Sequence, residues 1–261
     1  MKEPFFTIRQ LLRGCYLDVF GCMANPSKGI HILNGHYTHR VHPDSSYMEY
    51  MLNELSYVAN FIRIEEAVRM ILTHIEPDEP LIAFTFDDGF EECYDAIAPE
   101  LEKYEINAAF FVNPNFVEGD DEYIKHFTEI TTLSPGKRPM RWNQIIDLSK
   151  RGFIIGAHTM DHYLTASSDI DELKHQIVDC KAIIEDKTGV SCDYFAWPYG
   201  KLEQTNKQAV EIACDNYKYV FSQSDYRNYF SFEGKVINRR HFEPSWPVNH
   251  VKYFLSKQKH Y

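Results

Sequence analysis

The sequence of 261 residues has no apolar run long enough to cross a bilayer as a helix and no cluster of basic residues. Its formal net charge is -11, from 27 Lys and Arg against 38 Asp and Glu. A surface of this sign repels phosphate backbones, which argues against a nucleic-acid-binding protein. The charge sets no limit on a neutral ligand.

Cysteine is also sparse, and no two cysteines form a Cys-x-x-Cys pair; the six are Cys15, Cys22, Cys93, Cys180, Cys192 and Cys214. Scattered cysteines of this kind predict reduced thiols rather than a disulfide framework. No signal peptide is recognised, because Arg13 and Asp18 interrupt the apolar stretch 11–24. We therefore expect a cytoplasmic protein that meets its substrate inside the cell.

The composition allows a large core, since 44% of the residues are hydrophobic and 15% are aromatic. The length suits a single domain over 1–261, with 1–29 as an N-terminal extension. Apolar strand candidates alternate with segments of helical spacing, which predicts an α/β fold with parallel strands and right-handed crossovers. The stretch 113–139 is expected to be a long irregular loop on the substrate side, or a local insertion.

Two adjacent carboxylates, Asp87 and Asp88, follow the apolar run 81–86 and precede Gly89. The run predicts a buried strand, so both carboxylates would lie at its carboxyl end, where parallel sheets and barrels bind ligands. Two neighbouring carboxylates repel each other, which is unfavourable unless they have a binding or catalytic role. One carboxylate bound to a cation, with the other free to accept protons, would resolve the repulsion.

A second chemical motif, His158-Thr159-Met160-Asp161-His162, follows the apolar strand candidate 153–157. Histidines four apart share one face if the backbone turns helically after the strand. Two imidazoles and a carboxylate form a common metal set that leaves coordination positions open. Two surface histidines would explain this spacing in isolation, but its place behind a strand favours a metal site.

Three motifs resemble those of the polysaccharide deacetylases, the NodB-like carbohydrate esterase family. They are Thr85-Phe86-Asp87-Asp88-Gly89, the His158–His162 motif and Phe195-Ala196-Trp197-Pro198-Tyr199-Gly200. The resemblance covers roughly 30–247 and departs from the family at Phe195, where an arginine is usual. It implies a distorted, incomplete (β/α) barrel of about seven parallel strands.

The resemblance also implies a divalent metal, zinc or else cobalt or nickel, on Asp88, His158 and His162. Asp87 would be the general base for a metal-activated water that attacks an acetyl carbonyl. The implied reaction removes N-acetyl groups from an amino sugar or a polysaccharide intermediate. Two other functions stay open: a non-catalytic carbohydrate-binding relative, and a hydrolase of non-sugar C–N bonds on the same fold.

The third motif implies that the backbone N–H of Tyr199, after Pro198, stabilises an oxyanion, although a plain turn also explains Pro-Tyr-Gly. Trp246 is predicted to stack on a sugar, with a core position as the alternative. Arg239 or Arg240 could replace the missing arginine and orient Asp87, or both could be solvated. Arg240 and Pro198 are also predicted to bind substrate.

The general acid has two candidates. Many relatives carry a histidine near the C-terminus, where this chain has His241. Another branch has a permuted order, and His36, after the strand candidate 30–33, resembles its acid histidine. We predict His36, because Arg239 and Arg240 flank His241 and would weaken it as a proton donor. The nearby His31, His39 and His42 could instead form a separate metal cluster, although their spacing is irregular.

Overall fold

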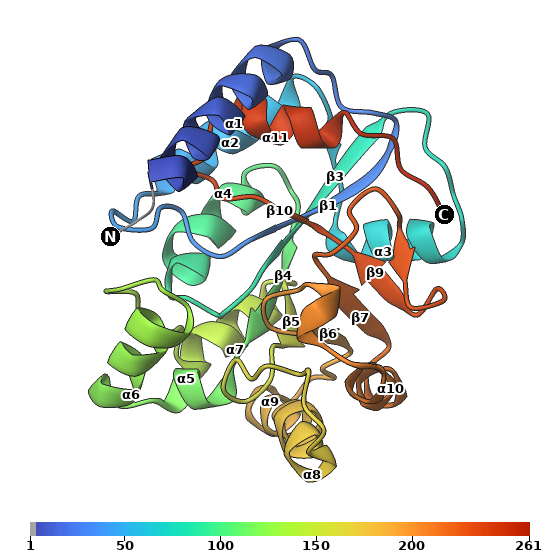
Figure 1. The fold of residues 1–261 in the computed structure, drawn as a ribbon. Helices are drawn as coiled ribbons and strands as arrows, with labels where there is room; N and C mark the ends of the chain where they lie inside the picture. Colours follow the sequence, from blue (N-terminus) through green and yellow to red (C-terminus); the bar gives the residue numbers. More distant parts are fainter. Residues whose placement is uncertain (1–3) are drawn as a thin grey trace.

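A curled, mostly parallel sheet forms the centre of the molecule in the computed structural model, which describes residues 4–261 (Figure 1). Its strands follow the order β10-β1-β3-β4-β5-β6-β7-β9-β8, and β2 pairs with β3 outside this path. The strands are β1 (Gly29–Gly35), β2 (Asn60–Phe61), β3 (Pro80–Phe86), β4 (Ala108–Val112), β5 (Ile154–Ala157), β6 (Tyr194–Ala196), β7 (Tyr219–Ser222), β8 (Phe230–Ser231), β9 (Val236–Asn238) and β10 (Arg240–His241).

The sheet is a half-barrel, as the predicted incomplete (β/α) barrel requires. Only Arg239 separates β9 from β10, yet these strands pair near opposite ends of the path, β9 with β7 and β10 with β1. All pairs are parallel except β8 with β9. If β9 and β10 are counted as one interrupted strand, the parallel strands along this path are β1, β3, β4, β5, β6, β7 and β9–β10, seven in all, and the short β2 adds a parallel pairing with β3 outside the path.

Helices cover the sheet because its strands are apolar on both faces, as buried parallel strands are. Alternate residues of β3 belong to two cores: Phe84 packs with the outer helices, whereas Ala83 packs with α3 and the inward side chains of neighbouring strands. Phe111 of β4 meets Phe221 of β7 with ring centroids 5.6 Å apart, which shows that the second core fills the inside of the curl.

The helices are α1 (Pro4–Cys22), α2 (Ser45–Ser56), α3 (Ile64–Leu72), η1 (Cys93–Ile97), α4 (Ala98–Glu102), α5 (Pro114–Glu118), α6 (Asp121–His126), η2 (Phe127–Thr131), α7 (Trp142–Lys150), α8 (Ile170–Lys174), η3 (His175–Asp179), α9 (Cys180–Thr188), η4 (Leu202–Gln204), α10 (Lys207–Asn216) and α11 (Val248–Leu255). The predicted irregular stretch 113–139 is therefore wrong over much of its length. The helices α5, α6 and η2 form there because Phe116 and Phe127 pack with Phe90 in a small core of their own.

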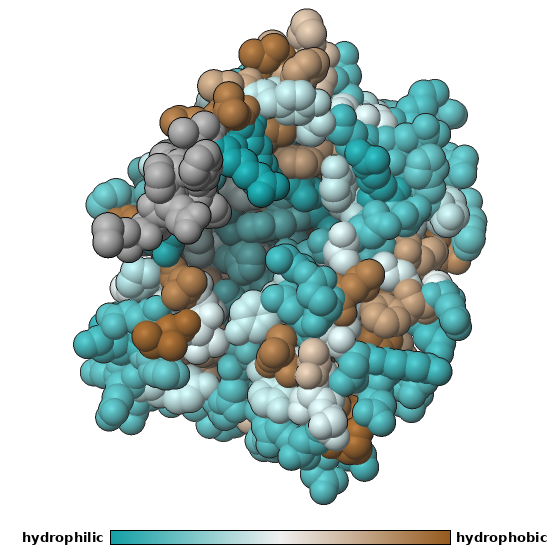
Figure 2. All heavy atoms as spheres, in the orientation of Figure 1, coloured by the Kyte–Doolittle hydropathy of each residue, from teal (hydrophilic) through white to brown (hydrophobic). Residues whose placement is uncertain are grey.

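The predicted N-terminal extension contains α1, which lies along α11 (Figure 1). Gly21 allows the close approach, because a Cβ there would overlap the carbonyl oxygen of Asn249. Exposed apolar side chains on α1 include Leu11, Leu12 and Val19, and Met23 follows its end. Figure 2 shows brown side chains along the edge of the molecule where α1 lies. In the stretch 4–261, no helix combines the length and the apolar character that a membrane span needs.

Candidate metal centre and active site

Asp88, His158 and His162 converge at the carboxyl ends of β3 and β5. Asp88 Oδ1 lies 3.5 Å from His158 Nε2 and 3.4 Å from His162 Nε2. All three side chains are buried, and their candidate ligand atoms lie within 4.8 Å of one another. The two motifs that the sequence singled out are thus brought together in space.

Hydrogen bonds orient the first histidine toward Asp88. His158 Nδ1 lies 2.7 Å from the carbonyl oxygen of Ala196, so this nitrogen donates and the lone pair of Nε2 faces Asp88. The side-chain amide of Asn113 donates to the carbonyl oxygens of His158 and Thr159 and fixes the backbone of the motif. A buried asparagine on the neighbouring strand end therefore positions a candidate ligand.

The backbone of this motif does not turn helically, so the two histidines converge without the condition under which their spacing was interpreted. Thr159 and His162 have φ angles of 63° and 58°, in the left-handed region that residues other than glycine avoid. Asp88 and Tyr199 share this conformation, with φ of 71° and 65°. Sparsely populated backbone conformations of this kind cluster at functional sites, where the surrounding structure maintains them.

The donor set fits a divalent cation. Asp88 Oδ1 is buried and has no hydrogen-bond partner among the described residues, although it faces two imidazoles. Burial raises the pKa of Asp88 to about 7. Burial lowers the pKa of His158 to about 4 and that of His162 well below its usual value, which keeps both rings neutral, the form that binds metals. A cation would partner the bare carboxylate oxygen.

Asp87 has the opposite environment. Arg239 donates to it twice, from Nη1 to Oδ1 at 2.8 Å and from Nη2 to Oδ2 at 3.0 Å. Asn34 and Gln223 also donate to Oδ2, at 3.0 and 3.2 Å. Burial opposes ionisation, but the Arg239 guanidinium outweighs it and holds the pKa of Asp87 well below its usual range. Asp87 is therefore a fixed carboxylate, and Oδ1 is its less occupied oxygen.

Of the two arginine candidates, only Arg239 contacts Asp87. It is fully buried inside the curl, next to the rings of Phe111 and Phe221, while Phe195 fills the family's arginine position with core packing. Adjacent strand residues point to opposite faces. Arg240 therefore points away, and its guanidinium carbon lies 3.5 Å from the ring centroid of Phe254 on α11. The substrate-binding role of Arg240 stays a prediction, and its side chain packs on Phe254.

The third motif borders the same site. Pro198 is buried, whereas Tyr199 is partly exposed, and its ring centroid lies 4.6 Å from that of His162. The carbonyl oxygen of Gly200 accepts a hydrogen bond from the backbone N–H of Gln223, whose side chain reaches Asp87. The turn is thereby tied to the carboxylate pair. The contribution of the Tyr199 N–H to catalysis stays a prediction.

His36 and His241 lie side by side on one carboxylate. His36 Nδ1 is 2.7 Å and His241 Nε2 is 3.0 Å from Glu243 Oε1, and the two rings are 5.2 Å apart. The two arginines next to His241 in sequence point to Asp87 and Phe254, so the predicted reason for its weakness as an acid is wrong. The partner of His241 is a carboxylate.

Glu243 is a site residue that the sequence reasoning missed. The sequence feature that could have revealed it is the spacing of Arg239, His241 and Glu243. Residues at every second position lie on one face of an extended chain. Burial alone would lower the pKa of His36, but Glu243 raises it to about 9. Conversely, burial opposes ionisation of Glu243, and His36 holds its pKa at about 2.

Trp246 lies beside this second group, with its ring centroid 4.9 Å from that of His241. It also lines a cavity of about 250 Å³ between α1 and α11 and packs against the outer core. The predicted stacking on a sugar stays a prediction. The other N-terminal histidines do not join either group: His31 contacts the carbonyl oxygen of Ser27, and His39 stacks on His42.

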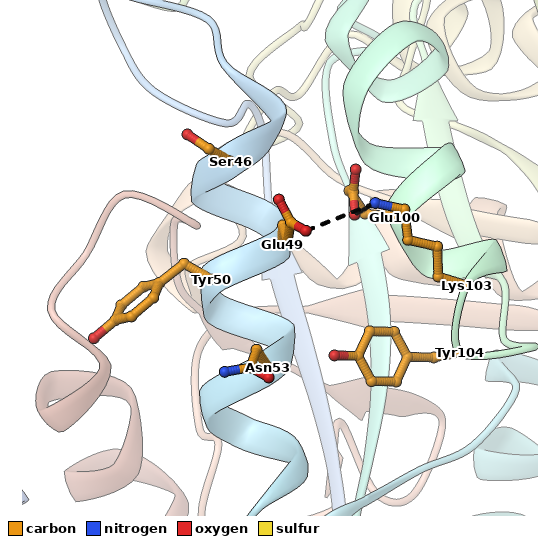
Figure 3. A pocket seen from close by; sticks show the side chains of 7 residues that line it. All are labelled: Ser46, Glu49, Tyr50, Asn53, Glu100, Lys103 and Tyr104. Carbon is orange, nitrogen blue, oxygen red and sulfur yellow. Dashed lines mark ion pairs between the residues drawn. The ribbon is translucent and has the colours of Figure 1, made fainter.

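A hydrophilic hollow opens near the centre of Figure 2, where β1 and β10 run beneath α1 in Figure 1. These strands bring His36 and His241 to the site. A separate depression of about 490 Å³ lies between α2 and α4 (Figure 3). Its charged side chains pair with each other, Glu49 with Lys103 at 3.9 Å and Lys103 with Glu100 at 2.6 Å, and none of the predicted site residues lines it.

The fold and site together define an α/β half-barrel protein with two histidines paired to a carboxylate and, separately, a metal-compatible set of ligands. The chain belongs to the polysaccharide deacetylase family, whose model matches residues 74–216. YxkH of Bacillus subtilis is 22% identical over 147 residues, which are 56% of this chain and 47% of YxkH. YlxY of the same organism is 24% identical over 53% of this chain and 36% of its own length. The chain thus spans less than half of these curated relatives.

Solved structures share the fold. IcaB from Ammonifex degensii superposes with a TM-score of 0.71 at 21% identity, covering 89% of this chain and 99% of IcaB. The Streptococcus pyogenes deacetylase PplD, solved in complex with acetate, gives a TM-score of 0.66 at 20% identity, covering 87% of this chain and 97% of PplD. At these identities the similarity shows the architecture.

Proposed function

We propose that the chain is a metal-dependent deacetylase that hydrolyses the N-acetyl group of an amino sugar, either free or within a glycan. The observation that carries the proposal is the opposite environment of two adjacent aspartates. Asp87 is held as a carboxylate by Arg239, while Asp88 turns a bare oxygen toward two neutral imidazoles. A base and a metal ligand placed side by side are what hydrolysis of an amide requires.

Asp88, His158 and His162 would hold the cation. When bound, a divalent cation supplies Lewis-acid chemistry, because it polarises a carbonyl group and makes water more acidic. The three ligands leave room in the coordination sphere, as catalytic sites do. The nitrogen and oxygen set suits zinc, with cobalt and nickel as the alternatives.

Asp87 takes the proton from the attacking water. Its Oδ1 accepts a hydrogen bond only from Arg239 among the described contacts, so this oxygen has capacity for a proton. Arg239, Asn34 and Gln223 prevent the carboxylate from rotating. The orientation is fixed before substrate binds, which lowers the cost of reaching the transition state.

His36 gives a proton to the leaving amine. Glu243 holds Nδ1, so Nε2 is the nitrogen that remains for the substrate. The C–N bond breaks as the amine takes this proton, and acetate and a free amino group are the products. The structurally similar PplD was solved in complex with acetate, the acid that this reaction would release.

The test is acetate release by purified protein, loaded with zinc and then dialysed, from a panel of N-acetylated monosaccharides, oligosaccharides and nucleotide- or lipid-linked sugars. The panel should include formamides and cyclic imides. Acetate from at least one sugar, lowered by about 10²–10⁴-fold in Asp87→Asn, supports the proposal. Glycan binding without release would favour a non-catalytic relative, and hydrolysis of the imides alone would favour the non-sugar alternative.

A further inference from the structure

A second group of candidate metal ligands lies beside the first and shares no residue with it. The ligand atoms of His36, His241 and Glu243 all lie within 4.8 Å of one another. The group contains two imidazole nitrogens and one carboxylate oxygen, the same atom types as the Asp88 group. Imidazole and carboxylate together suit zinc and other divalent transition metals.

Glu243 is oriented as a ligand would be. Its Oε2 accepts hydrogen bonds from the backbone N–H groups of His36 at 3.2 Å and Tyr37 at 3.4 Å. This leaves Oε1 directed at both rings, at 2.7 Å from His36 and 3.0 Å from His241. Carboxylates and rings fixed in this way need little rearrangement to coordinate an ion, because a modest outward shift makes room between the three atoms.

The group is also reachable from solvent. The side chains of His36 and His241 are 22% and 36% exposed, whereas that of Glu243 is 7% exposed. A cation could enter on the histidine side, keep water on its remaining positions, and find a buried negative charge behind it. Trp246, edge-on to His241, limits the movement of that ring.

We propose that His36, His241 and Glu243 form a second divalent-cation site, and that a cation bound there inhibits the enzyme. The cation replaces the protons between each ring and Glu243, and these protons leave to solvent. A ring that coordinates through Nδ1 can release its Nε2 proton only by becoming an imidazolate, so His36 becomes a far weaker acid. The inhibition rests on the proposed function, whereas the binding does not.

Equilibrium dialysis against zinc alone tests the binding. The unmodified chain should bind two zinc ions, and His241→Gln should bind one. His162→Gln should lose the ion at Asp88 and keep the ion at Glu243. His250→Gln is the matched control, because His250 is a partly exposed histidine that also pairs with a carboxylate, Asp18 at 2.9 Å, and it should bind two.

Activity tests the inhibition. Excess zinc should lower the turnover of the zinc-loaded chain by roughly 10²-fold, the scale of a lost general acid. Half-inhibition of His241→Gln should need about 10–100-fold more zinc, with each variant compared to its own activity at one equivalent. Circular dichroism should verify folding, and Glu243→Gln provides a second variant that should lose the second ion if His241→Gln does not fold.

The outcomes separate the two proposals. One zinc per unmodified chain at every concentration, or an undiminished second ion in folded His241→Gln, overturns the second site. Two ions with unchanged turnover would overturn the inhibition. Two ions on a protein that releases no acetate from any substrate would leave the second site standing and reject the proposed function.

Discussion

At the scale of single residues, the site depends on how differently Asp87 and Asp88 are surrounded. The two are adjacent in sequence, but a guanidinium and two amides partner Asp87, while the Oδ1 atom of Asp88 faces only imidazoles among the described residues. Neighbouring carboxylates often divide acid–base tasks in this way when their environments push their pKa values apart.

Replacing Asp87 with Asn should leave metal binding intact and lower acetate release by about 10²–10⁴-fold. The amide keeps the shape of the side chain but cannot accept a proton from water. Metal analysis and acetate release on the same preparation measure both effects. Asp88→Asn is the comparison and should lose the metal. Loss of metal from Asp87→Asn would show that the two roles are exchanged.

The general acid His36 should determine the pH above which kcat falls. His36 faces Glu243, His241, Asp87 and Asp88, and Glu243 raises its pKa to about 9 despite burial. A raised pKa means that the protonated donor is present below about pH 9 and is lost above it. We expect kcat to fall above this pH, and Glu243→Gln to move the fall to lower pH.

His36→Ala should lower turnover by about 10²–10⁴-fold and abolish this fall in the same titration. His241→Ala should cost less. A fall that does not move in Glu243→Gln would contradict the pairing, and a larger loss in His241→Ala would assign the acid role to His241.

Residues were predictable where a motif follows an apolar strand. Asp87, Asp88, His158 and His162 could be placed together because parallel strands end at one edge of the sheet. Glu243 belongs to no motif, and its role depends on β10 pairing with β1, a contact between distant parts of the chain. The family motifs alone do not locate the arginine that orients Asp87, because Arg239 reaches Asp87 from another strand.

At the scale of elements, the short helices after β4 hold the loop that carries His158 and His162. Asp161, inside that loop, accepts hydrogen bonds from Tyr123 of α6 at 2.6 Å and Asn115 of α5 at 2.7 Å. These helices left little trace in the sequence pattern because they are short, and they form by packing around Phe90. Periodicity is judged over a window of roughly 11–18 residues, so it cannot detect helices as short as these.

Asn113→Ala should weaken metal binding by about 10–100-fold, the usual effect of losing a residue that positions a ligand. The side chain fixes the carbonyl groups of His158 and Thr159 and touches no candidate ligand atom of the metal set. Zinc affinity measured with a competing chelator checks the prediction. Asn115→Ala, whose side chain reaches Asp161 rather than a ligand's backbone, should cost less. Equal losses would show that the loop is held as a whole.

At the scale of the whole molecule, segments far apart in the sequence pack against each other. The segment from β9 to β10 pairs at both ends of the curl, and α1 lies along α11 (Figure 1). Alternation of strands and helices predicted the parallel sheet. It could not predict α1, in which Leu17 and Gly21 are the buried residues of the part 9–22.

Gly21→Ala should destabilise the docking of α1, because the added methyl group would overlap the carbonyl oxygen of Asn249. Gly14→Ala is the matched control in the same helix: no atom of the described residues lies within 4 Å of its added Cβ, so it should stabilise by about 0.5–1 kcal/mol. Thermal unfolding and limited proteolysis of α1 measure both. Equal shifts in the two variants would contradict the close helix contact.

The left-handed backbone at Asp88, Thr159, His162 and Tyr199 implies a trade-off between heat resistance and activity. Asparagine tolerates this conformation better than most residues, and Asp88→Asn also removes a buried carboxylate oxygen that no group in 4–261 partners. In the presence of a chelator, we expect this inactive variant to melt at a higher temperature than the parent chain. A melting temperature at or below that of the parent would show that Asp88 does not lower the stability of the fold. A higher melting temperature would mean that the protein retains a destabilising residue because the site needs it.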